Sequence, residues 1–287
     1  MNILKIISKI KTEEKAIKYL IKKGILKKEK ICYKCKKAMK MNFVLKTFIC
    51  NNRKFLKRIS IFKNIFFQTY KTKINKLLML CYFYLLKTPV DEIKKATGLC
   101  SATITDWTHY LRQLLGEAVD EEQTVIGGPG IIVEVDETKM GKRKYNRGRR
   151  VEGVWVIAGI ERTPEKKIFV VEIPERNKSN ITQILSKYIR EGSIVYTDCW
   201  KAYVPACQDL SLVHKTVNHS KGFVNKDDGT HTNTVEGLNN GLKTLIKPRN
   251  RNKKNIKYYL MYYIWRRLHS KKIWKGFLKA LKEVKYN

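Results

Sequence analysis

Apolar positions follow two different rhythms along this chain, and the change falls near residue 119. Up to that point they recur every three or four residues with lysines between them, which is the spacing of amphipathic helices. Beyond it, β-branched runs occupy 131–138, 154–162 and 167–174, separated by turn-forming or charged residues. The acidic and then Gly- and Pro-rich segment 119–130 lies between the two patterns, so we expect a domain boundary there.

The helical half contains a pair of segments with the spacing of a helix-turn-helix. Two short helices ending at Gly24 and an apolar helix at 73–86 come first. In the segment that follows, Asp91 would cap a short helix, Gly98 would make the turn and Ser101 would cap a second helix. A plain helical hairpin has the same pattern, so both alternatives stay open.

The second half alternates strands and helices in a definite order. After the three β-branched runs come a helical segment at 180–190, a fourth strand at 194–199, a fifth at 211–219 and a helix from about Thr234 to Lys247. Strands, a helix, a strand and a further helix in this order indicate an RNase H-like α/β domain. In that fold the first and fourth strands are neighbours, so residues at their ends reach the same edge of the sheet.

Charge narrows the possible partners. The 287 residues include 60 Lys and Arg against 25 Asp and Glu, a formal net charge of +35, and residues 1–60 carry 19 basic and 3 acidic side chains. Such an excess repels itself and favours a polyanionic partner, most simply DNA or RNA. A codon bias towards lysine would produce part of the same excess without any partner. With 43% hydrophobic residues the chain can build a core, which excludes general disorder.

Neither a membrane span nor a secretory signal is expected, because charged residues interrupt the apolar stretches. The seven cysteines are odd in number and unevenly spread, which favours a reducing compartment over a disulfide framework. The compartment then follows the host, and is the cytoplasm in a bacterium or the nucleus in a eukaryote.

The first cysteines have the spacing of a metal knuckle. Cys32 and Cys35 form a CxxC pair, and a strand-like stretch leads from them to Cys50. Structural Zn²⁺ takes four ligands in tetrahedral geometry, but Phe55 stands where a fourth cysteine would be expected. We therefore interpret the segment as a degenerate zinc-ribbon-like hairpin that binds Zn²⁺ only with a ligand from elsewhere. The alternative is a small β-hairpin with unused cysteines.

Three acidic residues are candidates for a common site. Asp136 ends an apolar run and precedes a dense cationic segment, Asp198 ends the fourth strand, and Glu236 lies on the helix after the fifth strand. Carboxylates are the ligands that Mg²⁺ and Mn²⁺ prefer, and such ions beside lysines suit phosphate chemistry. The residues alone thus predict metal-dependent phosphoryl chemistry, provided that the three carboxylates meet.

Four stretches resemble a known family. They are VEVDETKMGKRKYNRGRRVEGVWVIAGIER, YTDCWKAY, VNHSKGFVN and GTHTNTVEGLNNGLK, which together span about 130–247. In wording and order they are similar to DDE-type insertion-sequence transposases of the ISXO-like family. The resemblance implies an RNase H-like catalytic domain behind a DNA-binding region, and metal-dependent cutting and joining of DNA at the ends of a mobile element.

The resemblance also implies roles for single residues. The family's first two acids correspond to Asp136 and Asp198, and the third position falls on Asn233 or Glu236, since members carry Asn, Glu or His there. We favour Glu236, because Lys243 follows it by seven residues and returns to the same helix face. Asp136, Asp198 and Glu236 would then hold two Mg²⁺ or Mn²⁺ ions.

Basic residues around these positions are candidate contacts to DNA. The alternative for any single lysine or arginine is a solvated surface charge. The alternative for the histidine is an ordinary structural role. The candidates are Lys139, Lys142, Arg143, Lys144, Arg147, Arg149, Arg150, Lys201, His219, Arg249 and Arg251.

We therefore expect a transposase that binds element ends and target DNA, as a homodimer or larger assembly because transposition joins two ends. Two departures from the family favour an alternative: Asn239 stands where the family often has Trp, and Phe55 replaces the fourth cysteine. That alternative is a catalytically inactive or domesticated DNA-binding protein derived from a transposase. A nuclease of the same fold, which hydrolyses DNA without joining it, is the third possibility.

The expected organisation has five parts. These are a basic region with the degenerate zinc-ribbon-like segment at 1–60, a helical, helix-turn-helix-like DNA-binding region at 61–120, a linker at 121–130, the catalytic domain at 131–270 and a basic C-terminal helix or tail at 271–287.

Overall fold

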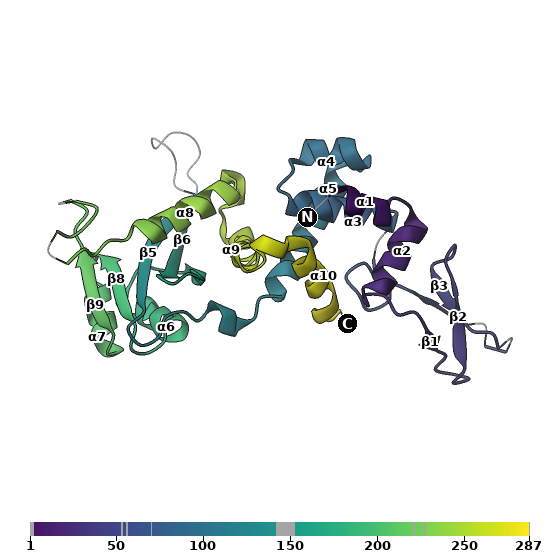
Figure 1. Ribbon diagram of the computed structural model, residues 1–287, viewed down its shortest axis with the longest axis horizontal. Coiled ribbons are helices and arrows are strands. Elements are labelled where there is room, and N and C mark those ends of the chain that lie inside the picture. Colours follow the sequence, from purple (N-terminus) through teal and green to yellow (C-terminus); the bar gives the residue numbers. More distant parts are fainter. Residues whose placement is uncertain are drawn as a thin grey trace. The chain divides into compact units, whose positions relative to one another are not determined.

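The computed structural model describes residues 3–52, 54–55, 57–69, 71–141, 153–220, 222–226 and 228–286. The chain forms two compact units (Figure 1). Unit 1 consists of Met1–Ala118 together with His269–Asn287, and unit 2 consists of Val119–Leu268. The first boundary lies where the apolar rhythm changes along the sequence. The C-terminal residues belong to the same compact unit as the N-terminal residues.

Unit 1 is mostly helical. Its α-helices are α1 Ile3–Ile10, α2 Glu13–Lys22, α3 Ile74–Leu85, α4 Val90–Thr97, α5 Ser101–Glu117 and α10 Ile273–Glu283. Gly98 ends α4 in the left-handed conformation with a φ of 65°, which glycine adopts without steric cost. The N-cap positions of α4 and α5 are occupied by Pro89 and Cys100. Asp91 and Ser101, the expected caps, therefore lie inside the first turns.

A small antiparallel sheet completes unit 1. Its strands lie in sequence order and are β1 Lys30–Ile31, β2 Ala38–Asn42, β3 Thr47–Ile49 and β4 Arg58–Ser60. The hairpin expected from the sequence corresponds to β2 and β3, where Met41 is paired with Phe48. A further strand lies on each side of this hairpin, and the turn between β1 and β2 carries the CxxC pair.

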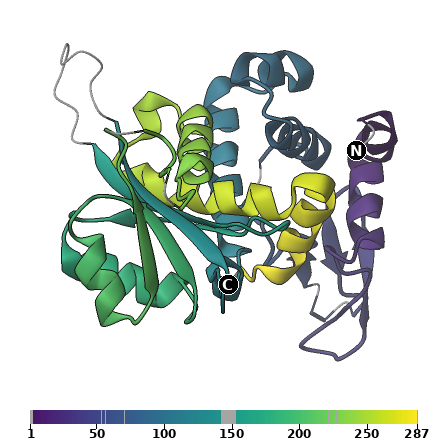
Figure 2. The same ribbon diagram turned by 60° about the vertical axis from the view of Figure 1, so that its left-hand side comes forward.

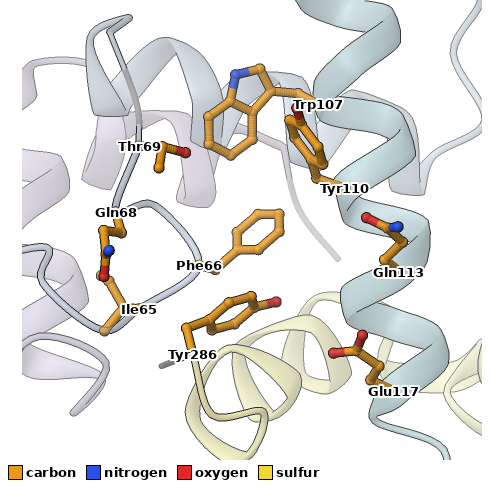
Figure 3. Close-up of a pocket in the computed structure, with 9 residues that line it drawn as sticks. All are labelled: Ile65, Phe66, Gln68, Thr69, Trp107, Tyr110, Gln113, Glu117 and Tyr286. Atoms are coloured by element: carbon orange, nitrogen blue, oxygen red, sulfur yellow. The ribbon is translucent and has the colours of Figure 1, made fainter.

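Unit 1 also contains a pocket of 240 Å³ between the loop before α3, helix α5 and the C-terminal tail (Figure 3). Phe66 and Trp107 meet edge to face inside it, with ring centroids 5.5 Å apart. The lining residues are Ile65, Phe66, Gln68, Thr69, Trp107, Tyr110, Gln113, Glu117 and Tyr286. None of the predicted site residues that the structure describes lines this pocket.

Unit 2 is built on a mixed five-stranded sheet with the strand order β7-β6-β5-β8-β9. The strands are β5 Ile132–Met140, β6 Val154–Glu161, β7 Ile168–Ile173, β8 Ile194–Asp198 and β9 Val213–Val217. β5, β6 and β7 are antiparallel neighbours, whereas β8 runs parallel to both β5 and β9. Glu134 of β5 is paired with Tyr196 of β8. Two residues further along each strand, Asp136 and Asp198 therefore lie side by side, where β8 ends and β5 continues to Met140.

Helices cover both faces of this sheet (Figure 2). α6 Lys178–Tyr188 and α7 Tyr203–Asp209 lie on one face, and α8 Asn233–Leu245 and α9 Lys253–Leu268 lie on the other. Because side chains alternate along a strand, Val133 and Val135 of β5 point into the core under α6 and α7, whereas Glu134 and Asp136 face α8. Helix α7 was not predicted from the sequence.

The aromatic C-terminal segment 256–281 forms two helices separated by a turn. Helix α9 ends at Leu268, a 3₁₀ turn follows at Ser270–Lys272, and α10 starts at Ile273. The residues around the break, His269–Lys272, include no apolar side chain that would continue the buried stripe of α9. In the part of the chain that the structure describes, every helix is too short or too polar to cross a membrane.

Candidate active site at the edge of the sheet

Asp136 lies near the middle of the predicted acidic site. Its Oδ2 accepts a hydrogen bond of 2.8 Å from Nδ2 of Asn239 on α8. The pKa of Asp136 is raised to about 6, chiefly by burial and then by the negative charge of Asp198, with a smaller contribution from Glu236 and against the lowering effect of the Asn239 hydrogen bond. The three predicted acids are therefore close enough in space to interact electrostatically.

Asp198 is the last residue of β8, and the backbone fixes its orientation. Its Oδ1 accepts a hydrogen bond of 2.9 Å from the backbone N–H of Trp200, which closes a tight turn directly after the strand. The carboxylate is thus held at the edge of the sheet instead of rotating freely.

Glu236 lies in the first turn of α8 and meets His219. The Nε2 atom of His219 is 3.5 Å from Oε1 of Glu236 and 3.0 Å from the Thr232 hydroxyl. His219, which the sequence placed near the site, is therefore in contact with the third candidate acid. The side chain of Glu236 is 40% exposed, so a ligand can reach it from solvent.

A fully buried carboxylate attaches α8 to the strand that carries Asp136. Glu134 accepts hydrogen bonds from the backbone N–H groups of Thr234 and Val235, at 2.8 and 3.0 Å, and from the Thr234 hydroxyl at 2.7 Å. The first N–H groups of a helix have no partner within the helix, and a negative charge there is favoured by the helix dipole. Glu134 therefore fixes the turn of α8 that contains Glu236.

Arg162 balances the charge of Glu134. Its Nε atom lies 2.6 Å from Glu134 Oε1, and its Nη2 donates to the backbone carbonyl of His231 at 2.9 Å. The guanidinium also lies over the Tyr196 ring, 4.8 Å from the ring centre. The Glu134–Arg162 pair thus links β5, β6, β8 and the segment leading into α8.

The side chains at this edge suit hard divalent cations. All the candidate ligand atoms are oxygens, as Mg²⁺ and Mn²⁺ prefer. The Oδ1 atom of Asn239 is buried and has no hydrogen-bond partner among the described residues. Turning this amide over would bring its oxygen against the Asp136 carboxylate, so Oδ1 must be the atom that is left without a partner. A cation or its water would satisfy it.

The carboxylates are spread more widely than the ligands of a single compact ion. In the described part of the chain, one group of three candidate ligand side chains has all its ligand atoms within 4.8 Å, and it is formed by cysteines. The oxygens of Asp136, Asp198 and Glu236 therefore do not all lie within 4.8 Å of one another.

The remaining predicted residues occupy varied positions. Asn233 is exposed at the start of α8, one turn before Glu236, and Lys243 is exposed in the last turn. Lys139, Lys201 and Arg249 are also exposed. Lys142, Arg143, Lys144, Arg147, Arg149 and Arg150 lie outside the described residues.

Arg251, a predicted DNA contact, binds the C-terminus of α8. Its Nη2 donates to the carbonyl of Lys243 at 2.5 Å, and its Nε donates to the carbonyl of Ile246 at 2.8 Å. The last carbonyls of a helix lack partners within the helix, and a positive charge is favoured there. Arg251 thus serves as a C-terminal cap of α8.

Reasoning from the sequence missed several residues around the site. The signal for Glu134 was available, because an acid two residues before Asp136 on an apolar strand must face the same side. Asn239 was noticed only as a departure from the family. No local pattern marked Arg162 or Arg176, because their partners lie far away in the sequence. The residues around the site that sequence reasoning missed are Glu134, Glu137, Arg162, Arg176 and Asn239.

The cysteines of unit 1 form the second candidate metal site. The sulfur atoms of Cys32, Cys35 and Cys50 lie within 4.8 Å of one another. A hydrogen bond from the Cys35 backbone lowers the pKa of Cys32 to about 7, which favours the thiolate that metals bind. Phe55, at the expected fourth position, has an exposed side chain. Among the described residues, three thiols are thus available for a soft metal, and a fourth ligand must come from outside.

Clustered carboxylates at the edge of a mixed sheet, in a strongly cationic chain, are typical of enzymes that process nucleic acids with metal ions. The model of one such family, the ISXO2-like transposase domain, matches residues 113–267. The match covers more than half of the chain, and the chain belongs to this family. Transposases of this family are enzymes of DNA transposition, and such enzymes generally use divalent metal ions. A comparison with curated proteins found none that matches.

Proposed function

We propose that unit 2 is an RNase H-like catalytic domain that cuts DNA at the ends of a mobile element and joins it to target DNA. The observation that carries this proposal is the electrostatic coupling of Asp136 to both Asp198 and Glu236. The strand order β7-β6-β5-β8-β9, with β5 parallel to β8, supports the fold assignment.

The third acidic position is assigned to Glu236. Its charge acts on Asp136, and its helix turn is fixed by Glu134. Asn233 lies exposed at the first position of α8. An Asn would also provide only a neutral carbonyl, which compensates the charge of a cation less well than a carboxylate does.

Asp136, Asp198 and Glu236 would hold two Mg²⁺ or Mn²⁺ ions. When bound, such ions activate the attacking oxygen and stabilise the leaving oxygen of the phosphodiester. The protein's own groups keep the carboxylates in place: Asn239 binds one oxygen of Asp136 and the Trp200 amide binds one oxygen of Asp198. His219 is placed to donate a proton or a hydrogen bond beside Glu236.

Unit 1 is proposed to recognise DNA. The short helix α4, the left-handed Gly98 and the longer helix α5 have the order of a helix-turn-helix. A net charge of +35 supports a polyanionic partner for the whole chain. The three cysteines near this region would stabilise it if Zn²⁺ and an external ligand complete the site.

The experiment compares strand cleavage by the wild type with cleavage by Asp136→Asn and Asp198→Asn, on DNA that carries the element ends with Mg²⁺ present. We expect each variant to lose roughly 10²–10³-fold in rate, because a metal ligand contributes several kcal/mol to the transition state. The matched control is Asp209→Asn, an exposed acid on α7 that pairs with Lys178. Cleavage by either site variant at the wild-type rate would show that the metal site is misassigned.

Two rival functions predict different products. A DNA-binding relic would bind the same DNA but would not nick it when Mg²⁺ is added. A nuclease would yield cut strands without joined products. Joined element–target DNA made by the wild type, and absent with Asp136→Asn, is the result that the proposed function requires.

A further inference from the structure

A stack of cationic and aromatic side chains borders the acidic site on the sheet face opposite α8. Arg176, in the connection between β7 and α6, places its guanidinium carbon over two indole rings, 4.6 Å from the ring centre of Trp155 and 4.4 Å from that of Trp200. Lys139 Nζ lies 5.5 Å from the centre of the Trp155 ring. Arg176 lies outside the four sequence motifs, and the proposed mechanism does not use it.

The two indoles hold the guanidinium in a fixed orientation. Trp155 and Trp200 both pack against the core under α6 and α7, and Trp200 also meets Tyr203 edge to face, with ring centroids 5.6 Å apart. A guanidinium stacked on anchored rings has lost its rotational freedom before any ligand arrives, so binding costs less entropy. The side chain of Arg176 nevertheless remains 32% exposed.

The acidic partner of Arg176 uses little of its hydrogen-bonding capacity. Nη2 of Arg176 lies 3.4 Å from Oε2 of Glu137, a long contact, and this is the one side-chain hydrogen bond that the guanidinium makes among the described residues. The side chain of Glu137 is 1% exposed, and its Oε1 has no partner with hydrogen-bond geometry in the same part of the chain, although the Tyr203 hydroxyl interacts with this carboxylate and lowers its pKa. A guanidinium has five N–H donors, so most of those on Arg176 are left for a ligand.

The stack is connected to the proposed metal ligands through Asp198 at the end of β8. Glu137 follows Asp136 on β5, and Trp200 donates its backbone N–H to Asp198. A DNA strand that approaches these carboxylates brings further negative charge, which cations next to the site must offset. Planar guanidinium groups bind phosphate oxygens in a bidentate manner. Arg176 is therefore a cation near this edge whose position and orientation are fixed in advance.

We propose that Arg176 is a preorganised binding site for a phosphate of the DNA backbone, next to the phosphate that is cut. The indoles of Trp155 and Trp200 cover the faces of the guanidinium, and its N–H edge contacts the phosphate oxygens. This inference rests on the proposed function for the choice of DNA as ligand. The contact itself is an electrostatic one and does not require the protein to be catalytically active.

The test measures the salt dependence of DNA binding without divalent ions, using fluorescence anisotropy of a labelled duplex that carries the element end. Neutralising one phosphate contact lowers the slope of log K against log salt by about 0.9. For Arg176→Gln we expect this change and an affinity about 10- to 100-fold weaker at low salt, since hydrogen bonds to charged groups are strong. The matched control, Lys178→Gln, removes an exposed lysine two residues away that pairs with Asp209, and its slope should equal that of the wild type.

A double variant separates phosphate binding from simple compensation of Glu137. If Arg176 only neutralises Glu137, then Glu137→Gln combined with Arg176→Gln will regain the wild-type slope and affinity, and the proposal is overturned. If Arg176 binds phosphate, the double variant keeps the lower slope. An unchanged slope for Arg176→Gln alone would also overturn the proposal.

A further variant covers the case in which both glutamine variants fail to fold, as judged by circular dichroism. Arg176→Lys keeps the charge opposite Glu137 but loses the planar fork, so we expect an affinity several-fold weaker than that of the wild type. Equal affinity would contradict the proposal. Because no measurement includes a divalent ion, a failure of the proposed function, seen as normal cleavage by Asp136→Asn, remains distinguishable from a failure of this inference.

Discussion

Removing the Glu134 carboxylate should release α8 from the sheet. Glu134→Ala takes away the acceptor for the N–H groups of Thr234 and Val235 and leaves the guanidinium of Arg162 without its carboxylate. Glu134 is completely buried and the side chain of Arg162 is only 24% exposed, so water replaces the lost contacts poorly. The Glu134→Ala substitution therefore breaks a buried ion pair and leaves the charge of Arg162 uncompensated.

The expected cost is about 3–5 kcal/mol, the usual range when one partner of a buried pair is removed. Each unsatisfied helix N–H alone accounts for about 1–3 kcal/mol, but these terms overlap with the charge term and are not added to it. Against a total stability of about 5–15 kcal/mol, this loss is large. Glu134→Gln keeps one carbonyl oxygen as acceptor and should cost about 1–3 kcal/mol.

The assay is urea denaturation followed by circular dichroism, combined with hydrogen exchange of the amides of α8. Hydrogen exchange identifies α8 directly, which matters because two compact units can unfold separately. In Glu134→Ala, Thr234 and Val235 should exchange at least about tenfold faster. The matched control is Asp209→Ala, which breaks the exposed pair with Lys178 and should cost about 0–1 kcal/mol. A cost below about 1 kcal/mol for Glu134→Ala, with α8 still protected, would refute the reasoning.

The other predictions concern protons and metals. The pKa of Asp136 is raised to about 6, so the folded state favours its protonated form. The free energy of unfolding of Asp136→Asn should therefore exceed that of the wild type by an amount that grows as the pH rises from about 4 to 6 and then levels off at no more than about 3 kcal/mol. Urea titrations measure this difference, and a difference that does not change with pH would contradict the prediction. Stabilisation of the wild type by Mg²⁺ in thermal melts should increase as the pH passes 6, because the ion binds the ionised carboxylate, and should be absent in Asp136→Asn. The amount of Zn²⁺ retained after purification should be lower in Cys50→Ser than in the wild type, as metal analysis can show. A strong chelator should remove the Zn²⁺ of the wild type without unfolding unit 2, as circular dichroism can show. Equal zinc content in Cys50→Ser and the wild type would exclude the thiol site.

The sequence predicted the strands of unit 2 well because their apolar runs are short, β-branched and bounded by turns. It also predicted that Asp136 and Asp198 lie on neighbouring strands, and β5 and β8 are paired. Asp198 ends β8 as expected, whereas β5 continues to Met140 beside β6, so Asp136 lies in the middle of its strand. The family assignment, made from four motifs, is confirmed by the match over residues 113–267. These features are local in the sequence or follow from strand order.

The surroundings of the acids could not be read in the same way. Glu134 and Val235 are separated by 101 positions, and Asp136 and Asn239 by 103. Pairing of this kind depends on how α8 lies on the sheet, and no periodicity records it. For the same reason, the sequence alone could not indicate that Arg251 would be bound to the carbonyls of α8.

Helix α8 is held at both ends by charged side chains from other parts of unit 2, Glu134 at its start and Arg251 at its end. Its position thus depends on its two termini more than on the residues along its solvent side, where Gly237 and Asn240 are exposed. Substitutions on that side should be tolerated during evolution without moving Glu236. A fluorescent probe attached at Asn240 would accordingly report on DNA arriving at the site while leaving the acidic residues in place.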